Sequence, residues 1–288
     1  MHPRVVTRDP IAVEVQVQAA YLAMFPDSDK VFIPQVFGWA IDCFTGQYGD
    51  YQAIDAQYHD FEHTLQGTLC LARLLHGRHR ASAQPALTQS MFQLAILAIL
   101  LHDTGYLKKK GDAQGTGAKY TVIHVRRSAD FAAELLGKKG FPPADIKSVQ
   151  NMILCTGINA PLDEIPFQSE LEKVAGFALG TADLLGQMAA EDYVAKLPVL
   201  YAEFAEAARN PLGQPYTMET FSGPDDLMQK TPVFWETYVR PKLERDFGGL
   251  YQFLTEPYPS GRNSYVERVE ANLESLRRHL AKNAATTA

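Results

Sequence analysis

The sequence contains few cysteines, no long hydrophobic run and no excess of basic residues. Its three cysteines are far apart and none belongs to a CxxC pair, which argues against a disulfide framework and favours the reducing cytoplasm. The longest apolar run, residues 94–101, is much shorter than the ~20 residues that span a bilayer. Residues 1–15 include acidic side chains and lack the apolar block of a signal peptide. These absences favour neither a membrane protein nor a secreted one.

The charge balance is also informative, because 33 acidic residues outweigh 27 lysines and arginines and give a net charge of −6. Proteins that bind the nucleic-acid backbone usually carry a basic stripe, so we expect no nucleic-acid partner. A small phosphate ester remains a possible substrate, since a metal ion and a few local cations can bind it. With 46% hydrophobic residues, the chain can bury a large core.

Nearly every segment has the apolar spacing of a helix, with no convincing strand and no internal repeat, and this predicts an all-α fold. No linker forces a second domain. We therefore expect an N-terminal helical segment (1–50) packed on a core (51–190), with a C-terminal helical extension (191–288) of the same domain. Residues 210–232, rich in proline and glycine, are predicted to form a loop that could close over a site. The expected helices are 11–25, 31–44, 51–79, 88–102, 120–136, 143–155, 169–188, 191–209, 233–247 and one beginning at 264.

The segment from Leu94 to Leu101 is apolar on all sides, which indicates a buried helix, and it is followed directly by His102 and Asp103. A buried histidine and aspartate need partners for their polar atoms. A metal ion is the natural partner for such a pair. The alternative is an ordinary hydrogen-bonded pair at a helix end.

Two further positions offer ligands for such an ion. His59 and His63 are four residues apart in the expected helix 51–79, so they share one helix face. Both could bind one metal, or one could bind it while the other donates a proton, although two ordinary histidines explain this weak spacing equally well. Asp183 lies at the edge of the apolar face of helix 169–188, where burial raises the pKa of a carboxyl group unless a cation compensates. A metal ion or a salt bridge would supply that cation.

Together these residues resemble the HD superfamily of metal-dependent phosphohydrolases. The family pattern is a histidine, then His-Asp at the end of a buried helix, then a distant aspartate. His63, His102, Asp103 and Asp183 match it in order, over residues 51–188. The resemblance implies an HD-type helical bundle and these four residues as ligands of a divalent metal ion.

A closer resemblance is to the catalytic domain of class I cyclic nucleotide phosphodiesterases. Their signature Tyr-His-Asn-x-x-His is similar to residues 58–63, with Asp60 in place of asparagine. It implies that His59 is the general acid and His63 a metal ligand. Their His-Asp-x-Gly-His is similar to residues 102–106, where Tyr106 replaces the second histidine. That family also implies an aromatic clamp from C-terminal helices, for which Trp235, Tyr238, Phe253 and Tyr258 are available.

His124 resembles the third histidine of two-metal HD proteins, which include the HD-GYP cyclic-dinucleotide phosphodiesterases. By this resemblance it would hold a second metal ion, bridged to the first by Asp103. A core or phosphate-facing histidine is the alternative. The Gly-Tyr-Pro motif of HD-GYP proteins is absent from the corresponding region, 150–156, so we do not expect membership of that group.

A run of cations lies between these motifs, and one or two of them could clamp phosphate while the rest are solvated. They are Lys108, Lys109, Lys110, Lys119, Arg126 and Arg127.

The functional prediction is a metal-dependent phosphohydrolase, more specifically a phosphodiesterase acting on a nucleotide-like or other small phosphate ester. The catalytic residues would be His59, as general acid, and Asp103. The cofactor would be one divalent ion, with a second possible, and Mg, Mn, Fe and Zn all remain open. The alternatives are an HD-fold di-iron oxygenase and a non-catalytic module that binds a metal or nucleotide. The sequence leaves the oligomeric state open.

Overall fold

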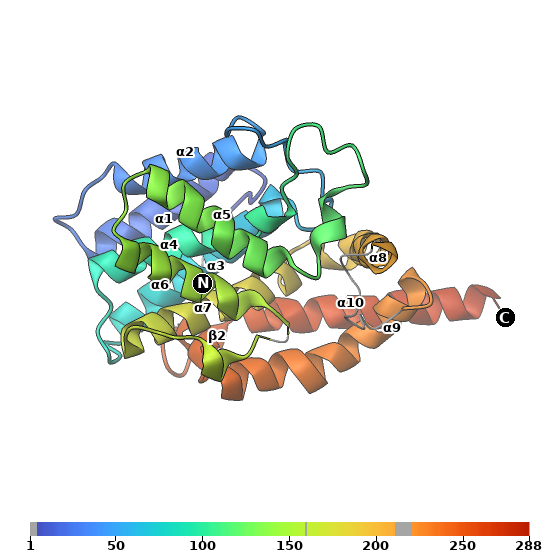
Figure 1. Ribbon diagram of the computed structural model, residues 1–288. Helices are drawn as coiled ribbons and strands as arrows, with labels where there is room; N and C mark the ends of the chain where they lie inside the picture. The colour runs from blue at the N-terminus through green and yellow to red at the C-terminus, as the bar shows by residue number, and fades with distance from the viewer. Residues whose placement is uncertain (1–4, 159, 211–220, 288) are drawn as a thin grey trace.

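The computed structural model describes residues 5–158, 160–210 and 221–287, and there the chain is mostly helical (Figure 1). This confirms the all-α expectation, apart from one short antiparallel ribbon of β1 (Thr255–Glu256) and β2 (Arg262–Asn263). No helix in the described ranges is long and apolar enough to cross a membrane. The helices are α1 (Pro10–Met24), α2 (Phe32–Phe44), α3 (Phe61–Arg80), α4 (Gln89–Leu101), α5 (His124–Lys138), α6 (Pro143–Ile153), α7 (Glu170–Met188), α8 (Tyr193–Arg209), α9 (Pro224–Phe234) and α10 (Ser264–Thr287).

Helix α4 is the buried helix that its sequence predicts. All residues from Leu94 to Leu101 are at most 5% exposed. The helix contacts α2, α3, α5, α6 and α7, so apolar neighbours surround it on every side. Thr88 caps its N-terminus by accepting a hydrogen bond from the Met91 N–H, and His102 is the C-cap. The helix therefore delivers His102 and Asp103 to the middle of the bundle.

Helices α3 and α7 pack along each other through glycines. A Cβ atom added to Gly186 of α7 would lie 2.8 Å from the backbone nitrogen of Gly67 in α3. Only glycine allows backbones to approach this closely. His63 precedes Gly67 by about one turn, and Asp183 precedes Gly186 by about one turn. The close crossing therefore brings these two side chains together.

The expectation that helix 51–79 includes His59 is wrong. Helix α3 begins at Phe61, and the Asp60 carboxylate accepts a hydrogen bond from the His63 N–H at 2.8 Å, which makes Asp60 the N-cap. Residues 51–60 are not helical, and Tyr51 forms a bridge with Lys109. Aspartate favours this cap because its side chain satisfies an N–H group that has no partner within the helix. His59 therefore lies before the helix.

Other boundaries differ from the expectation at particular residues. Helix α5 begins at His124 rather than at 120, after a 3₁₀ turn at 117–120. Helix α9 begins at Pro224, inside the predicted loop 210–232, because proline suits the first turn of a helix; residues 211–220 of that loop lie outside the described ranges. The last helix is capped by the Asn263 side chain, which accepts from the N–H groups of Tyr265 and Val266.

The chain after α9 continues in wider π-helical turns at 235–239 and 242–246, where a continuous helix 233–247 was expected. Pro241 lies between the two turns and cannot donate a backbone hydrogen bond, which interrupts the regular α-helical ladder.

Candidate metal centre

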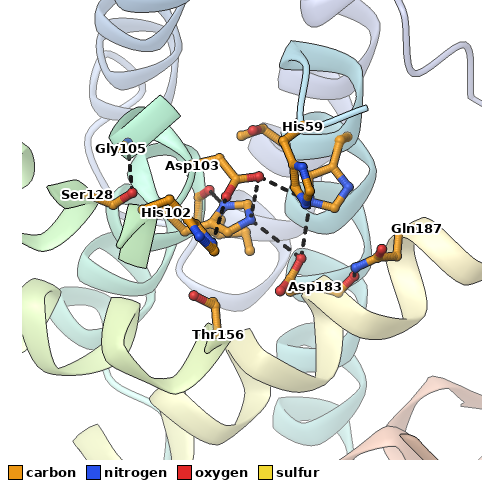
Figure 2. A network of polar contacts seen from close by, with 12 residues as sticks. His59, His102, Asp103, Gly105, Ser128, Thr156, Asp183 and Gln187 are labelled. Atoms are coloured by element: carbon orange, nitrogen blue, oxygen red, sulfur yellow. Dashed lines mark hydrogen bonds and ion pairs between the residues drawn. The ribbon is translucent and has the colours of Figure 1, made fainter. Parts of the chain in front are cut away.

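Four buried side chains meet where α3, α4 and α7 converge (Figure 2). His63 comes from α3, His102 and Asp103 from the end of α4, and Asp183 from α7. The Nε2 atom of His63 lies 3.2 Å from an oxygen of Asp103 and 3.3 Å from an oxygen of Asp183. The Nε2 atom of His102 lies 3.3 Å and 3.4 Å from the same two oxygens. The four atoms thus form a closed ring in which nitrogen and oxygen alternate.

The tautomer of His102 leaves no proton between its Nε2 atom and the two carboxylate oxygens. Its Nδ1 atom lies 2.7 Å from the backbone carbonyl of Ile99, which can only accept, so Nδ1 carries the proton. In the neutral imidazole, Nε2 is then a lone pair that faces two carboxylate oxygens. Neither His102 Nε2 nor Asp103 Oδ2 has a hydrogen-bond partner among the described residues. Buried atoms of this kind need a proton or a cation between them.

The spacing of the ring fits a metal ion. Metal–ligand bonds of about 2.0–2.2 Å separate neighbouring ligand atoms by about 3.0 Å at right angles and about 3.4 Å at tetrahedral angles. The four separations of 3.2–3.4 Å lie within or close to this interval. The donor atoms of His63, His102 and Asp103 all lie within 4.8 Å of one another, and Asp183 joins this group through its contacts with the two histidines. Two imidazoles and two carboxylates are a donor set suited to Zn, Fe or Mn.

The metal-free ring would hold protons instead. Burial lowers the pKa of His63, but Asp103 and Asp183 outweigh it and raise this pKa to about 10. The pKa of His102 is raised in the same way against the effect of burial. Burial raises the pKa values of the two carboxyl groups, yet the histidines hold both well below the usual range. A cation entering the ring would therefore displace protons.

His59 is held next to the ring by a residue that the sequence did not reveal. Its Nδ1 atom lies 2.6 Å from a carboxylate oxygen of Glu203, in α8. The other oxygen of Glu203 accepts from the Tyr58 N–H at 2.8 Å. Glu203 is 4% exposed; burial raises the pKa of its carboxyl group, but His59 outweighs this and holds it below the usual value. No motif marks Glu203, because its partner is 144 residues away and only folding brings them together.

His124, the first residue of α5, lies on the other side of Asp103. Its Nε2 atom is 3.9 Å from Asp103 Oδ1, and its Nδ1 atom donates to the backbone carbonyl of Thr121 at 2.5 Å. Burial lowers the pKa of His124 despite the nearby Asp103 carboxylate, which favours the neutral imidazole. The Gly105 N–H donates to Ser128 of α5 at 2.8 Å, which ties this helix to the segment that follows Asp103 (Figure 2).

Lys109, Lys110 and Arg126 are exposed, as expected for solvated cations, but Lys108 and Lys119 are buried, so the expectation is wrong for these two. Lys108 is 5% exposed and pairs with Asp55 at 2.7 Å. Lys119 is 6% exposed and pairs with Asp112 at 2.6 Å. Arg127 donates to two backbone carbonyl groups. These charges hold the segment 105–120 in place.

Of the C-terminal aromatic residues, Trp235 is buried in the core. Phe253 lies against Gly77. Gly77 is 14 residues along α3 from His63, or about 21 Å at 1.5 Å per residue, and Tyr258 stacks on Phe253. Two of the four candidates for an aromatic clamp are thus remote from the ring.

Comparison with known families gives one match. The model of the family described as Npun_R2479-like matches residues 110–254, half of the chain. The matched segment includes Asp183, Glu203 and His124, while His63 and the His102–Asp103 pair precede it. A search of curated proteins found no match.

Proposed function

The chain belongs to the Npun_R2479-like family, and we propose that it is a metal-dependent phosphohydrolase that cleaves phosphodiesters. The observation that carries the proposal is the buried ring of two histidines and two aspartates, in which a lone pair of His102 faces carboxylate oxygens. Those atoms need protons or a cation between them, and a phosphate ester is a substrate that a metal ion at such a site would activate.

The four ring residues would hold a divalent ion. Asp103 and Asp183 carry two negative charges, which balance the charge of the ion, and the histidines supply neutral nitrogen donors. Such an ion would supply positive charge against the phosphate and would lower the pKa of a bound water molecule toward ~7. The hydrogen bond from His102 to the Ile99 carbonyl fixes the orientation of the His102 imidazole before any ion binds.

His59 would act as the general acid. Glu203 accepts the Nδ1 proton of His59, which leaves Nε2 free to exchange a proton with a substrate. The carboxylate also stabilises the positively charged imidazole that must exist before proton transfer. An alkoxide leaving group needs such a proton because it is a strong base, and this favours an ester of an aliphatic alcohol.

The charge balance around the ring supports a diester over a monoester. Asp55 and Asp112 neutralise the buried Lys108 and Lys119, so these lysines add no net charge. A phosphodiester carries one negative charge, and a phosphomonoester carries nearly two at pH 7. The singly charged substrate needs fewer cations than the doubly charged one.

The test compares two phosphodiesters that differ in their leaving group. The metal-loaded protein should hydrolyse bis(4-nitrophenyl) phosphate, which releases a stable anion, and a cyclic nucleotide, which releases an alkoxide. The substitution His59→Ala should lower kcat by about 10²–10⁴-fold on the cyclic nucleotide, and by much less on the nitrophenyl ester, with the metal content unchanged.

Full activity of His59→Ala on both esters would remove the acid role. A metal-loaded protein that is inert on a broad panel of phosphate esters would favour the binding module. Two tightly bound irons per chain would favour the oxygenase.

A further inference from the structure

We propose that Tyr106 is a positioning residue, whose ring is the floor on which His59 and His124 lie side by side next to Asp103. The proposal rests on the proposed function for the role of His59, but its geometry can be tested without any activity.

The three rings form a triangle. The Tyr106 ring lies 4.5 Å from the His59 ring, nearly parallel at 12°, and 4.6 Å from the His124 ring at 24°. The two imidazoles are 6.0 Å apart. Rings on opposite faces of a phenol would be at least about 7 Å apart, twice the ~3.5 Å contact distance between carbon atoms. Both histidines therefore lie over the same face of Tyr106.

Neither histidine is oriented by the interior of a helix. His59 precedes the N-cap of α3, and His124 is the first residue of α5. Each has one hydrogen bond at Nδ1, to Glu203 or to the Thr121 carbonyl. A single hydrogen bond at one edge does not by itself fix the tilt of the imidazole plane. A flat ring stacked against its face removes this freedom.

Tyr106 itself is fixed by its backbone. The side chain is fully buried, and two glycines lie against backbone carbonyl groups of Tyr106 and His124. A Cβ atom at Gly117 would lie 2.2 Å from the Tyr106 carbonyl oxygen, and one at Gly105 would lie 2.0 Å from the His124 carbonyl oxygen. The Tyr106 N–H also donates to the Asp103 carbonyl at 3.1 Å. The segment that carries Tyr106 is thus held both to Asp103 and to the start of α5.

The first experiment compares Tyr106→Leu with Tyr106→Phe, which keeps the flat ring and loses only the hydroxyl. With the cyclic nucleotide, Tyr106→Leu should lower kcat by about 10²-fold, because misplacing a catalytic group by about 1 Å costs that much. Its KM and metal content should stay unchanged. Tyr106→Phe should restore kcat to within about twofold of the wild type. Full activity in Tyr106→Leu, or equal loss in both variants, contradicts the role of the ring face.

The second experiment asks whether Tyr106 acts through His59. In a His59→Ala background, Tyr106→Leu should cause little further loss, because the group that it positions is already gone. Two losses that multiply would show that Tyr106 acts elsewhere and would overturn the proposal.

The third experiment is independent of catalysis. The Nδ1 proton of His59, in its hydrogen bond to Glu203, should give a downfield NMR signal that is absent from His59→Ala. This signal should persist in Tyr106→Phe and shift or disappear in folded Tyr106→Leu; Tyr106→Met serves where the leucine variant does not fold. An unchanged signal without the ring would overturn the proposal. If the wild type showed the expected signals but hydrolysed no phosphodiester, the proposed function would fail and the positioning role would stand.

Discussion

The two sides of Asp103 present histidines in different ways. On the Oδ2 side, the Nε2 atoms of His63 and His102 point at carboxylate oxygens, so lone pairs and negative charge accumulate at one place. On the other side, around Tyr106, His59 and His124 are each satisfied at Nδ1 by a protein acceptor and are stacked on the phenol ring, and Nε2 of His124 lies 3.9 Å from Oδ1 of Asp103. The first arrangement needs protons or a cation between its atoms. The second holds two imidazoles in fixed orientations beside it, which under the proposed function would face the substrate.

The largest expected effect is a loss of metal binding on the ion side, which is the ring of His63, His102, Asp103 and Asp183. The other side is the group of His59, His124, Tyr106 and Glu203. Asp183→Asn removes one of the two charges that balance the ion, so the protein should lose the bound metal and its hydrolytic activity. The loss of metal affinity should exceed the ~10–100-fold that follows when a group merely supporting a ligand is removed. Metal content after dialysis and kcat measure it. Retention of a full equivalent of metal would contradict the assignment of Asp183.

The matched change on the other side is Glu203→Gln. The amide cannot stabilise a charged His59, and its NH₂ group can face Nδ1 and favour the wrong tautomer. We expect kcat on the cyclic nucleotide to fall by about 10²–10⁴-fold. The metal content should remain that of the wild type. A variant that loses metal as Asp183→Asn does would show that the two sides are not separate.

A smaller effect on metal binding and stability is expected from Gly186→Ala, which displaces α7 and therefore Asp183, but no residue of the other side. The added Cβ would lie 2.8 Å from the Gly67 backbone nitrogen, so α7 must shift away from α3. Such overpacking costs about 1–3 kcal/mol of unfolding free energy. Asp183 should move with α7, and this displacement from the other ring residues should weaken metal binding. Gly137→Ala in α5 is the control, because nothing lies within 4 Å of its added Cβ, and it should stabilise the protein by about 0.5–1 kcal/mol. Equal stability of the two variants would argue against the close crossing.

The last expected effect concerns the pH dependence of stability. The pKa of His63 is raised from about 6.5 in the unfolded chain to about 10 in the metal-free fold, with burial opposed by Asp103 and Asp183. Its contribution to stability is therefore complete below pH ~6.5 and is lost as the pH rises toward 10. The melting temperature of the metal-free protein should fall between pH 6.5 and 9. His63→Gln should give a flatter profile, whereas a wild-type profile as flat as that of the variant would contradict this account.

The ion side was visible in the sequence because local patterns identify its residues. The apolar run 94–101 predicted a buried helix that ends at His102 and Asp103, and the apolar face of helix 169–188 placed Asp183 at an edge. The expected bounds of that helix also agree with the structure, where it follows the Ser169 N-cap and ends at Met188. Local sequence determines such features, since caps and apolar faces depend on residues within a few turns.

The other side was largely hidden. The sequence identified His59 and His124 by resemblance, but placed His59 inside a helix, because the Asp60 cap was not recognised. Glu203 carried no signal, and Lys108 and Lys119 were read among surface charges although each has a buried partner. These features depend on contacts between residues distant in sequence or on how the chain returns upon itself, which periodicity does not encode.

The sequence by itself determined the helices, the burial of α4 and the order of the residues that form the ring. Only the tertiary structure decided that α3 and α7 cross at Gly67 and Gly186, that α8 brings Glu203 to His59, and that Tyr106 lies beneath two imidazoles. The physical reason is the range of the forces involved. Capping and hydrophobic periodicity act within a few residues, whereas backbone approach, ring stacking and buried hydrogen bonds exist only once distant segments are packed together.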